Sequence, residues 1–271
     1  MNVFSIGAAR NIGYYSSIRL LDAGCTVTFL LRTPSVFDGD EVINKYVASG
    51  KVTLVKGDAL TKSDVERGWA EAAKYGKVDL LLFTVGGTPH FSFRKGFIVE
   101  PHDLVTRCML NALCTIPKDS PLPKVVTVTS TGLTRSSHAA LPMLLKPLYA
   151  YLLAVPHHDK IGVERLLHHC AGWSWKEAKA NADHVLGANW LETPGLPERG
   201  SLEGVLIVRG AMFTDGESMA ESKGKKKGYR VTDSELPGAW TISRKDVAHF
   251  IVDALLNKWD QYGSKCISIA Y

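Results

Sequence analysis

The sequence predicts an α/β protein whose single domain is built on a doubly wound parallel sheet. Three observations predict it: a strand, turn and helix bounded by Gly7 and Gly13, apolar strand segments that end in glycine or hydroxyl residues, and helical segments between them. Apolar strands without alternation are typical of parallel sheets covered on both faces. Because no linker or repeat divides the chain, we expect one domain over residues 1–271, with an insertion before the sixth strand.

The first element expected is a strand over residues 3–6 that leads through a glycine-bounded turn into a helix. Such a turn places the amides of a helix N-terminus at the pyrophosphate of a dinucleotide. Gly7 suits the sharp turn, and Gly13 suits the tight packing of the helix on the strand. Asn11 stands where a middle glycine is usual, and asparagine tolerates a left-handed backbone. A purely structural turn is the alternative. The residues expected at the cofactor are Gly7, Ala9, Arg10, Asn11, Ile12 and Gly13.

A helix ending at Gly24 and a strand over residues 25–31 complete a βαβ unit. In NAD sites a carboxylate about 20 residues past the glycines binds the ribose 2′-hydroxyl, whereas an arginine there accommodates the 2′-phosphate of NADP. Arg32 holds that position, and residues 25–37 include no Asp or Glu. With Arg10 as a second guanidinium, we expect NADP (NADPH) rather than NAD. The alternative is that Arg32 is a solvated cation at a strand end.

Three later strands, over residues 51–56, 78–85 and 125–131, end in residues suited to a ligand crevice. Asp58 is expected at the adenine, or alternatively as a turn or cap carboxylate before a helix over residues 61–75. Ser130 is expected to hold a substrate oxygen or the nicotinamide amide. The residues at these strand ends that we expect at the cofactor are Asp58, Ala59, Val85, Gly86, Gly87 and Thr129.

In their order and spacing these segments resemble the short-chain dehydrogenase/reductase superfamily, in its atypical NmrA-like and flavin-reductase-like branch. The segment over residues 208–216 is similar to the family's R-P-x-x-L-T-D-G stretch, which implies that Ala211 and Met212 contact the cofactor. The resemblance implies a Rossmann fold and an NADP(H)-dependent oxidoreductase that reduces a small apolar carbonyl, quinone or flavin-like molecule. It also leaves open an NmrA-type redox sensor that binds NADP without turnover, and an isomerase or lyase.

The family's redox machinery is a Ser, a Tyr and a Lys in a Y-x-x-x-K arrangement. Lys160 matches the lysine that holds the ribose, but Pro156 stands at the tyrosine position. The alternatives are that Lys160 only forms a surface ion pair with Glu164, and that His157 or His158 caps a helix or packs in the core. The residues that we expect to take part in catalysis are Ser130, Lys160, Tyr149, Tyr151 and His157.

Two segments depart from the family. Residues 139–155 are almost entirely apolar but are interrupted by prolines and a lysine, which excludes a membrane span. They are expected to wall an apolar substrate pocket or to form a homodimer face, with core packing as the alternative. Residues 172–204 are the expected insertion, which we place over one end of the site.

Composition excludes several classes of protein. The net charge of +5 arises in a loop over residues 222–230, so a nucleic-acid-binding fold is not expected. That loop is either a solvated segment or a localisation or anionic-partner patch. The five cysteines form no CxxC pair, which predicts buried thiols, no metal site and a reducing compartment. Because the first strand starts at once, with no signal peptide, we expect a cytoplasmic protein.

Overall fold

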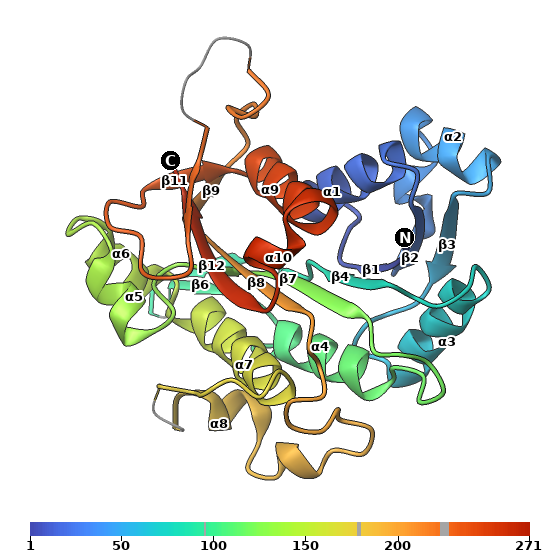
Figure 1. Ribbon diagram of the computed structural model, residues 1–271. Helices are drawn as coiled ribbons and strands as arrows, with labels where there is room; N and C mark the ends of the chain where they lie inside the picture. Colours follow the sequence, from blue (N-terminus) through green and yellow to red (C-terminus); the bar gives the residue numbers. More distant parts are fainter. Residues whose placement is uncertain (95, 178–179, 223–227) are drawn as a thin grey trace.

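The structure is a computed structural model that describes residues 1–94, 96–177, 180–222 and 228–271. One large sheet runs through its centre, with helices on both faces (Figure 1). The strands of this sheet are β1 (Asn2–Ile6), β2 (Thr26–Leu31), β3 (Val52–Lys56), β4 (Leu80–Phe83), β7 (Lys124–Ser130), β8 (Val205–Gly210), β10 (Arg230–Thr232) and β12 (Lys265–Ala270).

The order of strands in this sheet is β10-β12-β8-β7-β4-β1-β2-β3. All neighbours pair in parallel except β10 with β12. The chain moves outward from β1 to β3 and then returns to the other side of β1 at β4, which makes β1 and β4 the point where the strand order reverses. This arrangement confirms the predicted doubly wound α/β fold in a single domain.

The two faces of the sheet are covered by different helices (Figure 1). α1 (Asn11–Asp22) and α9 (Arg244–Asn257) pack side by side on one face, whereas α3 (Lys62–Ala73), α4 (Leu104–Cys114) and α7 (Ala154–Cys170) cover the other. Each face has its own apolar core cluster, with the strands alternating their side chains between the two. The remaining helices are α2 (Glu41–Ala48), α5 (Arg135–Ala140), α6 (Leu145–Leu152), α8 (Ala180–Leu186) and α10 (Trp259–Tyr262), with 3-10 turns η1 (Pro34–Phe37) and η2 (Trp190–Glu192).

Two small sheets lie beside the large one. β5 (His90–Ser92) and β6 (Gly96–Ile98) form an antiparallel pair, and β9 (Met212–Thr214) pairs in parallel with β11 (Thr241–Ser243). The second pair sets Phe213 opposite Ile242 and Thr214 opposite Ser243. It therefore brings together two segments that are about thirty residues apart along the chain.

The glycine loop between β1 and α1 has the backbone that its sequence predicts. Gly7 has φ +86° and Asn11 has φ +57°, both in the left-handed region. A Cβ on Gly7 would lie 2.6 Å from the Val85 Cα, so only glycine fits where the loop passes the end of β4. On Gly13, a Cβ would overlap the Thr84 hydroxyl oxygen and lie 2.7 Å from the Ala8 Cα. Close packing therefore requires both glycines, and the left-handed backbone is a second reason at Gly7.

A buried ion pair fixes α7 on the sheet. Glu164 of α7 is fully buried, and its two carboxylate oxygens accept hydrogen bonds of 2.9 and 2.6 Å from the Arg209 guanidinium of β8. The Thr129 hydroxyl of β7 donates a third bond to the same carboxylate, at 2.7 Å. The alternative of a surface ion pair between Lys160 and Glu164 is therefore wrong. Losing either charge would leave the other buried and uncompensated, which typically destabilises a protein by about 3–5 kcal/mol.

The two unusual segments of the sequence lie at the edges of the fold. Within residues 139–155, Leu141, Leu145 and Tyr149 form a small buried cluster, whereas Met143 and Leu144 are exposed. The segment over 172–204 contains α8 and η2 and lies between α7 and β8, the sixth strand of the large sheet along the chain. Residues 178–179 of that segment and 223–227 of the basic loop lie outside the described residues.

The cysteines are all free thiols. Within the described ranges, no helix combines the length and the apolar character that crossing a membrane requires. The same part of the chain holds no group of three or more His, Cys, Asp or Glu side chains arranged to bind a metal ion.

We predict that Gly13→Ala destabilises the protein although alanine favours a helix. The added methyl group meets the Ala8 backbone, which cannot move without disturbing the turn, and overpacking of this kind typically costs about 1–3 kcal/mol. We therefore expect the Tm to fall by roughly 2–10 °C in a thermal melt. Gly39→Ala is the control, since a Cβ there has no neighbour within 4 Å. An unchanged Tm for Gly13→Ala would contradict the packing role.

Candidate functional site

Two adjoining cavities lie along the carboxyl ends of the central strands. The first, of about 280 Å³, is named the Arg32 cavity and extends from the glycine loop to the ends of β2 and β3. The second, of about 220 Å³, is named the Lys160 cavity and extends from the same loop toward α7 and α9. The residues common to both are Gly7, Arg10, Val85 and Gly86. Together the cavities follow the edge of the sheet across the point where the strand order reverses, where α/β proteins bind ligands.

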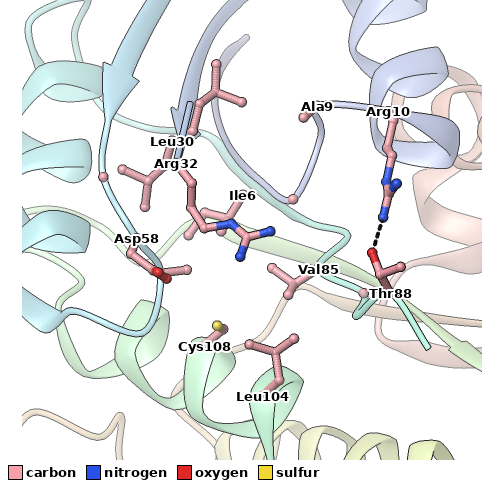
Figure 2. A pocket seen from close by; sticks show the side chains of 15 residues that line it. Ile6, Ala9, Arg10, Leu30, Arg32, Asp58, Val85, Thr88, Leu104 and Cys108 are labelled. Atoms are coloured by element: carbon pink, nitrogen blue, oxygen red, sulfur yellow. Dashed lines mark hydrogen bonds between the residues drawn. The ribbon is translucent and has the colours of Figure 1, made fainter. Parts of the chain in front are cut away.

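Arg32 extends across the first cavity from the end of β2 (Figure 2). The apolar walls of this cavity include Ile6, Leu30 and Leu104, so the Arg32 guanidinium lies between apolar surfaces. Cys108 of α4 lies at the same cavity, and burial raises the pKa of its thiol to about 12, so the thiol is neutral. A guanidinium in such a place suits a phosphate, because it offers a fork of donors and always carries its charge.

Arg10, which the sequence predicts at the cofactor, lines the Arg32 cavity from the glycine loop. Its guanidinium donates a hydrogen bond of 2.9 Å to the Thr88 hydroxyl, which lies beyond the end of β4 (Figure 2). Two guanidinium groups therefore border one cavity from different elements.

Asp58 and Ala59 follow β3 and also line the Arg32 cavity. One Asp58 carboxylate oxygen accepts a hydrogen bond of 2.9 Å from the Leu60 amide, and the Asp58 amide donates one of 2.8 Å to Asp64. Asp58 thus forms the turn before α3, which was the alternative expected for it, and it also borders the cavity; its place at the adenine stays a prediction.

The N-terminus of α1 opens into the Lys160 cavity, where Asn11, Ile12 and Gly13 are part of the lining. The N-cap residue Arg10 makes no side-chain capping bond, and the first turn of α1 has no acidic residue. The amides of this turn are thus available to an anion, which the helix dipole also favours. Gly86 and Gly87, which follow β4, also line this cavity.

Lys160 projects from α7 into the second cavity, where its ammonium lies 5.8 Å from the centre of the Phe213 ring. Burial lowers its pKa to about 8, against the raising effects of Asp159 and Glu164. Asp159, on the same turn, accepts bonds of 2.8 Å from the amides of Val105 and Thr106, which ties α7 to α4. Lys160 is thus a cation at neutral pH that loses its proton more readily than an ordinary lysine.

The other predicted catalytic side chains lie apart from the lining of the two cavities, as far as the described residues define it. Ser130 is buried at the end of β7. Tyr149 is buried with its ring 5.4 Å from that of His157, and burial raises the tyrosine pKa. Burial lowers the pKa of His157 to about 3, so this imidazole is neutral. Tyr151 is exposed and donates its hydroxyl to the carbonyl of Phe93.

Three predicted cofactor residues also contribute no lining to these cavities among the residues described. The Thr129 hydroxyl is directed to Glu164, Ala211 is buried in the core, and Met212 begins β9 with its side chain exposed. The lining instead includes Phe213 and Arg244, which the residue pattern did not single out. Phe213 belongs to the segment over residues 208–216 that carries the family resemblance, Arg244 directly follows β11, and the pairing of β9 with β11 brings the two together.

The chain is similar in sequence to one known reductase and similar in fold to several solved structures. The chain is 26% identical over 268 residues to the reductase pytE of Aspergillus terreus, covering 93% of this chain and 90% of that protein. It shares its fold with the anaerobillin reductase ChuY of Escherichia coli O157:H7, with a TM-score of 0.58 at 15% identity over 99% of this chain and 96% of that one. A short-chain dehydrogenase of Burkholderia cenocepacia, solved with NADP, gives a TM-score of 0.58 at 14% identity with the same two coverages.

A protein-family model described as NAD(P)H-binding matches residues 7–258 of the chain. This range begins at Gly7 of the glycine loop and ends just after α9, so it includes every residue that lines the two cavities except Ile6. The match confirms the type of family that the order of motifs predicts, and the chain belongs to the NAD(P)H-binding family.

Proposed function

We propose that this protein is an NADPH-dependent reductase of a small molecule with an apolar body, such as a carbonyl compound, a quinone or a flavin. The observation that supports it most is the placement of Arg32 and Arg10 at one cavity that continues, past the glycine loop, into a second cavity with Lys160. The two arginines, which suit a phosphate, and Lys160 thus lie along the same edge of the sheet. The pKa of Lys160 is about 8, so it can give up a proton near neutral pH. The reductase pytE, which resembles most of this chain, supports the class of reaction.

The residues present fit a dinucleotide. Gly86 borders both cavities, and a Cβ built on it meets no atom within 4 Å, so a side chain there would extend into free space beside the loop. The uncapped N-terminus of α1 faces that space. In this proposal Arg32 and Arg10 bind the 2′-phosphate, Asp58 lies at the adenine, the amides of α1 bind the pyrophosphate, and Lys160 binds the nicotinamide ribose.

NADPH, when bound, would supply a hydride to the substrate, and the reduction is completed by a proton. Among the described residues that line the Lys160 cavity, the titratable groups are Arg10, Arg244 and Lys160, and arginine does not lose its proton in proteins. With a pKa of about 8, Lys160 is mostly protonated at pH 7 and still a usable acid. We therefore assign the proton donation to Lys160, in place of the tyrosine that Pro156 replaces.

A redox sensor that binds NADPH without turnover is the second candidate. The observation that favours it is the separation of Ser130, Tyr149, Tyr151 and His157 from the lining of both cavities, within the part of the chain described. A sensor requires the binding residues alone. Measured turnover decides between the two, because a sensor oxidises no NADPH with quinones, flavins, enones or aromatic aldehydes.

Arg32→Ala should weaken NADPH binding roughly tenfold or more and leave NADH binding nearly unchanged. A charge-assisted hydrogen bond contributes about 1.5–3 kcal/mol, and about 1.4 kcal/mol is a factor of ten in affinity. Calorimetric titration of both cofactors measures the difference. Arg107→Ala is the control, because this arginine is on α4 but outside the lining of the cavity. Equal losses of affinity for NADPH and NADH would show that Arg32 does not bind the 2′-phosphate.

Gly86→Val should abolish measurable NADPH binding in a protein that melts at the wild-type temperature. The new side chain has free space in the folded protein but occupies the volume proposed for the cofactor. A fluorescence titration beside a circular-dichroism melt separates the two effects. Gly39→Val is the control, since a side chain there also meets nothing within 4 Å. Wild-type affinity in the Gly86 variant would argue against the two cavities as the cofactor site.

The rate of NADPH oxidation should fall as the pH rises through about 8, because only protonated Lys160 donates a proton and its pKa is about 8. The turnover number with menadione, measured from about pH 6 to about pH 10, tests this. Lys160→Met should lower the rate by about 10²- to 10⁴-fold, the usual contribution of a general acid. Lys74→Arg, an exposed lysine paired with Glu71, is the control. A wild-type rate that stays constant across this range would show that another group supplies the proton.

A further inference from the structure

The first turn of α9 carries two neighbouring cations with nearly identical surroundings. Arg244 forms an ion pair of 2.7 Å with Asp215, and Lys245 forms one of 2.6 Å with Glu217. The exposed fractions of the two cations are 25% and 27%, and those of the two carboxylates are 82% and 84%. Each cation also lies 5.8 Å from the centre of an aromatic ring. Exposed ion pairs such as these contribute little to stability, so neither partner is held firmly.

The two cations differ in what lies beside them. Arg244 lines the Lys160 cavity, and Lys245 is not part of that lining in the described chain. The ring beside Arg244 is Phe213, the same ring that Lys160 approaches from α7. Lys160 and Arg244 therefore border the same cavity and share one aromatic neighbour.

One cation that lines the Lys160 cavity has no role in the proposed binding of the cofactor. Its described lining includes Arg10, Lys160 and Arg244 and no carboxylate. A dinucleotide pyrophosphate carries about two negative charges, and the N-terminus of α1 already offers it amides and a favourable dipole. The 2′-phosphate is assigned to the neighbouring cavity with Arg32. Arg10 is assigned to that phosphate as well and Lys160 to the ribose, so Arg244 is the lining cation that is left without a role.

We propose that Arg244 binds a carboxylate of the substrate at the end of the Lys160 cavity, so that the enzyme acts on organic acids with an apolar body. This inference rests on the proposed reductase function and narrows its substrate class. The guanidinium exchanges the exposed Asp215 for the incoming carboxylate, which it binds through two parallel hydrogen bonds. Phe213 and Val128, which also line the cavity, offer the apolar surface against which the rest of the substrate packs.

The test measures binding to NADP⁺-saturated protein, which cannot transfer a hydride. Isothermal titration compares benzoate, cinnamate, 2-naphthoate and octanoate with their methyl esters. We expect at least one acid to bind wild type tenfold or more tightly than its ester, and Arg244→Gln to remove that preference. Asp215→Asn should strengthen binding of the acid, because it removes the competing carboxylate. Lys245→Gln is the matched control and should keep the wild-type preference.

Three results would overturn the inference: no preference for any acid in wild type, an undiminished preference in Arg244→Gln, or equal losses in Arg244→Gln and Lys245→Gln. The affinity for NADPH, measured by fluorescence, provides a further check. A tenfold loss in Arg244→Gln would assign this arginine to the pyrophosphate instead and would also overturn the inference.

These outcomes are separable from failure of the proposed function. If NADPH binds and is oxidised with quinones or aldehydes but acids are not preferred, the reductase proposal stands and the assignment to Arg244 fails. If acids bind through Arg244 but no acceptor is reduced, the carboxylate site stands and the reductase proposal fails.

Discussion

The candidate site depends on the close approach of the glycine loop to the end of β4. Gly7 passes the Val85 backbone, and Gly13 packs α1 against Ala8 and Thr84, at distances that leave no room for a Cβ. This contact brings the N-terminus of α1 to the same edge as the ends of β2, β3 and β4. The glycines are thus required because the loop has to pass close to the neighbouring strand while its amides remain open toward the cavity.

The second constraint is the buried carboxylate of Glu164. By accepting bonds from Arg209 and Thr129, it attaches the middle of α7 to two adjacent strands. Asp159 attaches the preceding turn of the helix to α4. Lys160 lies between these two anchors, so the part of α7 that carries it is fixed beside the cavity. Burial there lowers its pKa, whereas the two nearby carboxylates limit how far it falls.

The two cavities differ in character although they share the glycine loop. The Arg32 cavity combines guanidinium groups with apolar walls and a neutral thiol, which suits a flat base beside a phosphate. The Lys160 cavity has cations, glycines and one aromatic ring, and its described lining has no carboxylate. In the proposed function, the first cavity therefore holds the adenine end of the cofactor, and the second holds the nicotinamide end beside the substrate.

The sequence by itself determined the fold class, the glycine loop with its left-handed Asn11, and the position of Arg32 after β2, because these depend on local backbone preferences and on the order of strands. It also placed Lys160, through the family resemblance. Only the tertiary structure decided that Glu164 pairs with Arg209, that Tyr149 and His157 are buried against each other, and that Phe213 and Arg244 line the cavity. These features depend on contacts between segments far apart along the chain, and side-chain burial and pairing of that kind leave no periodic pattern in the sequence.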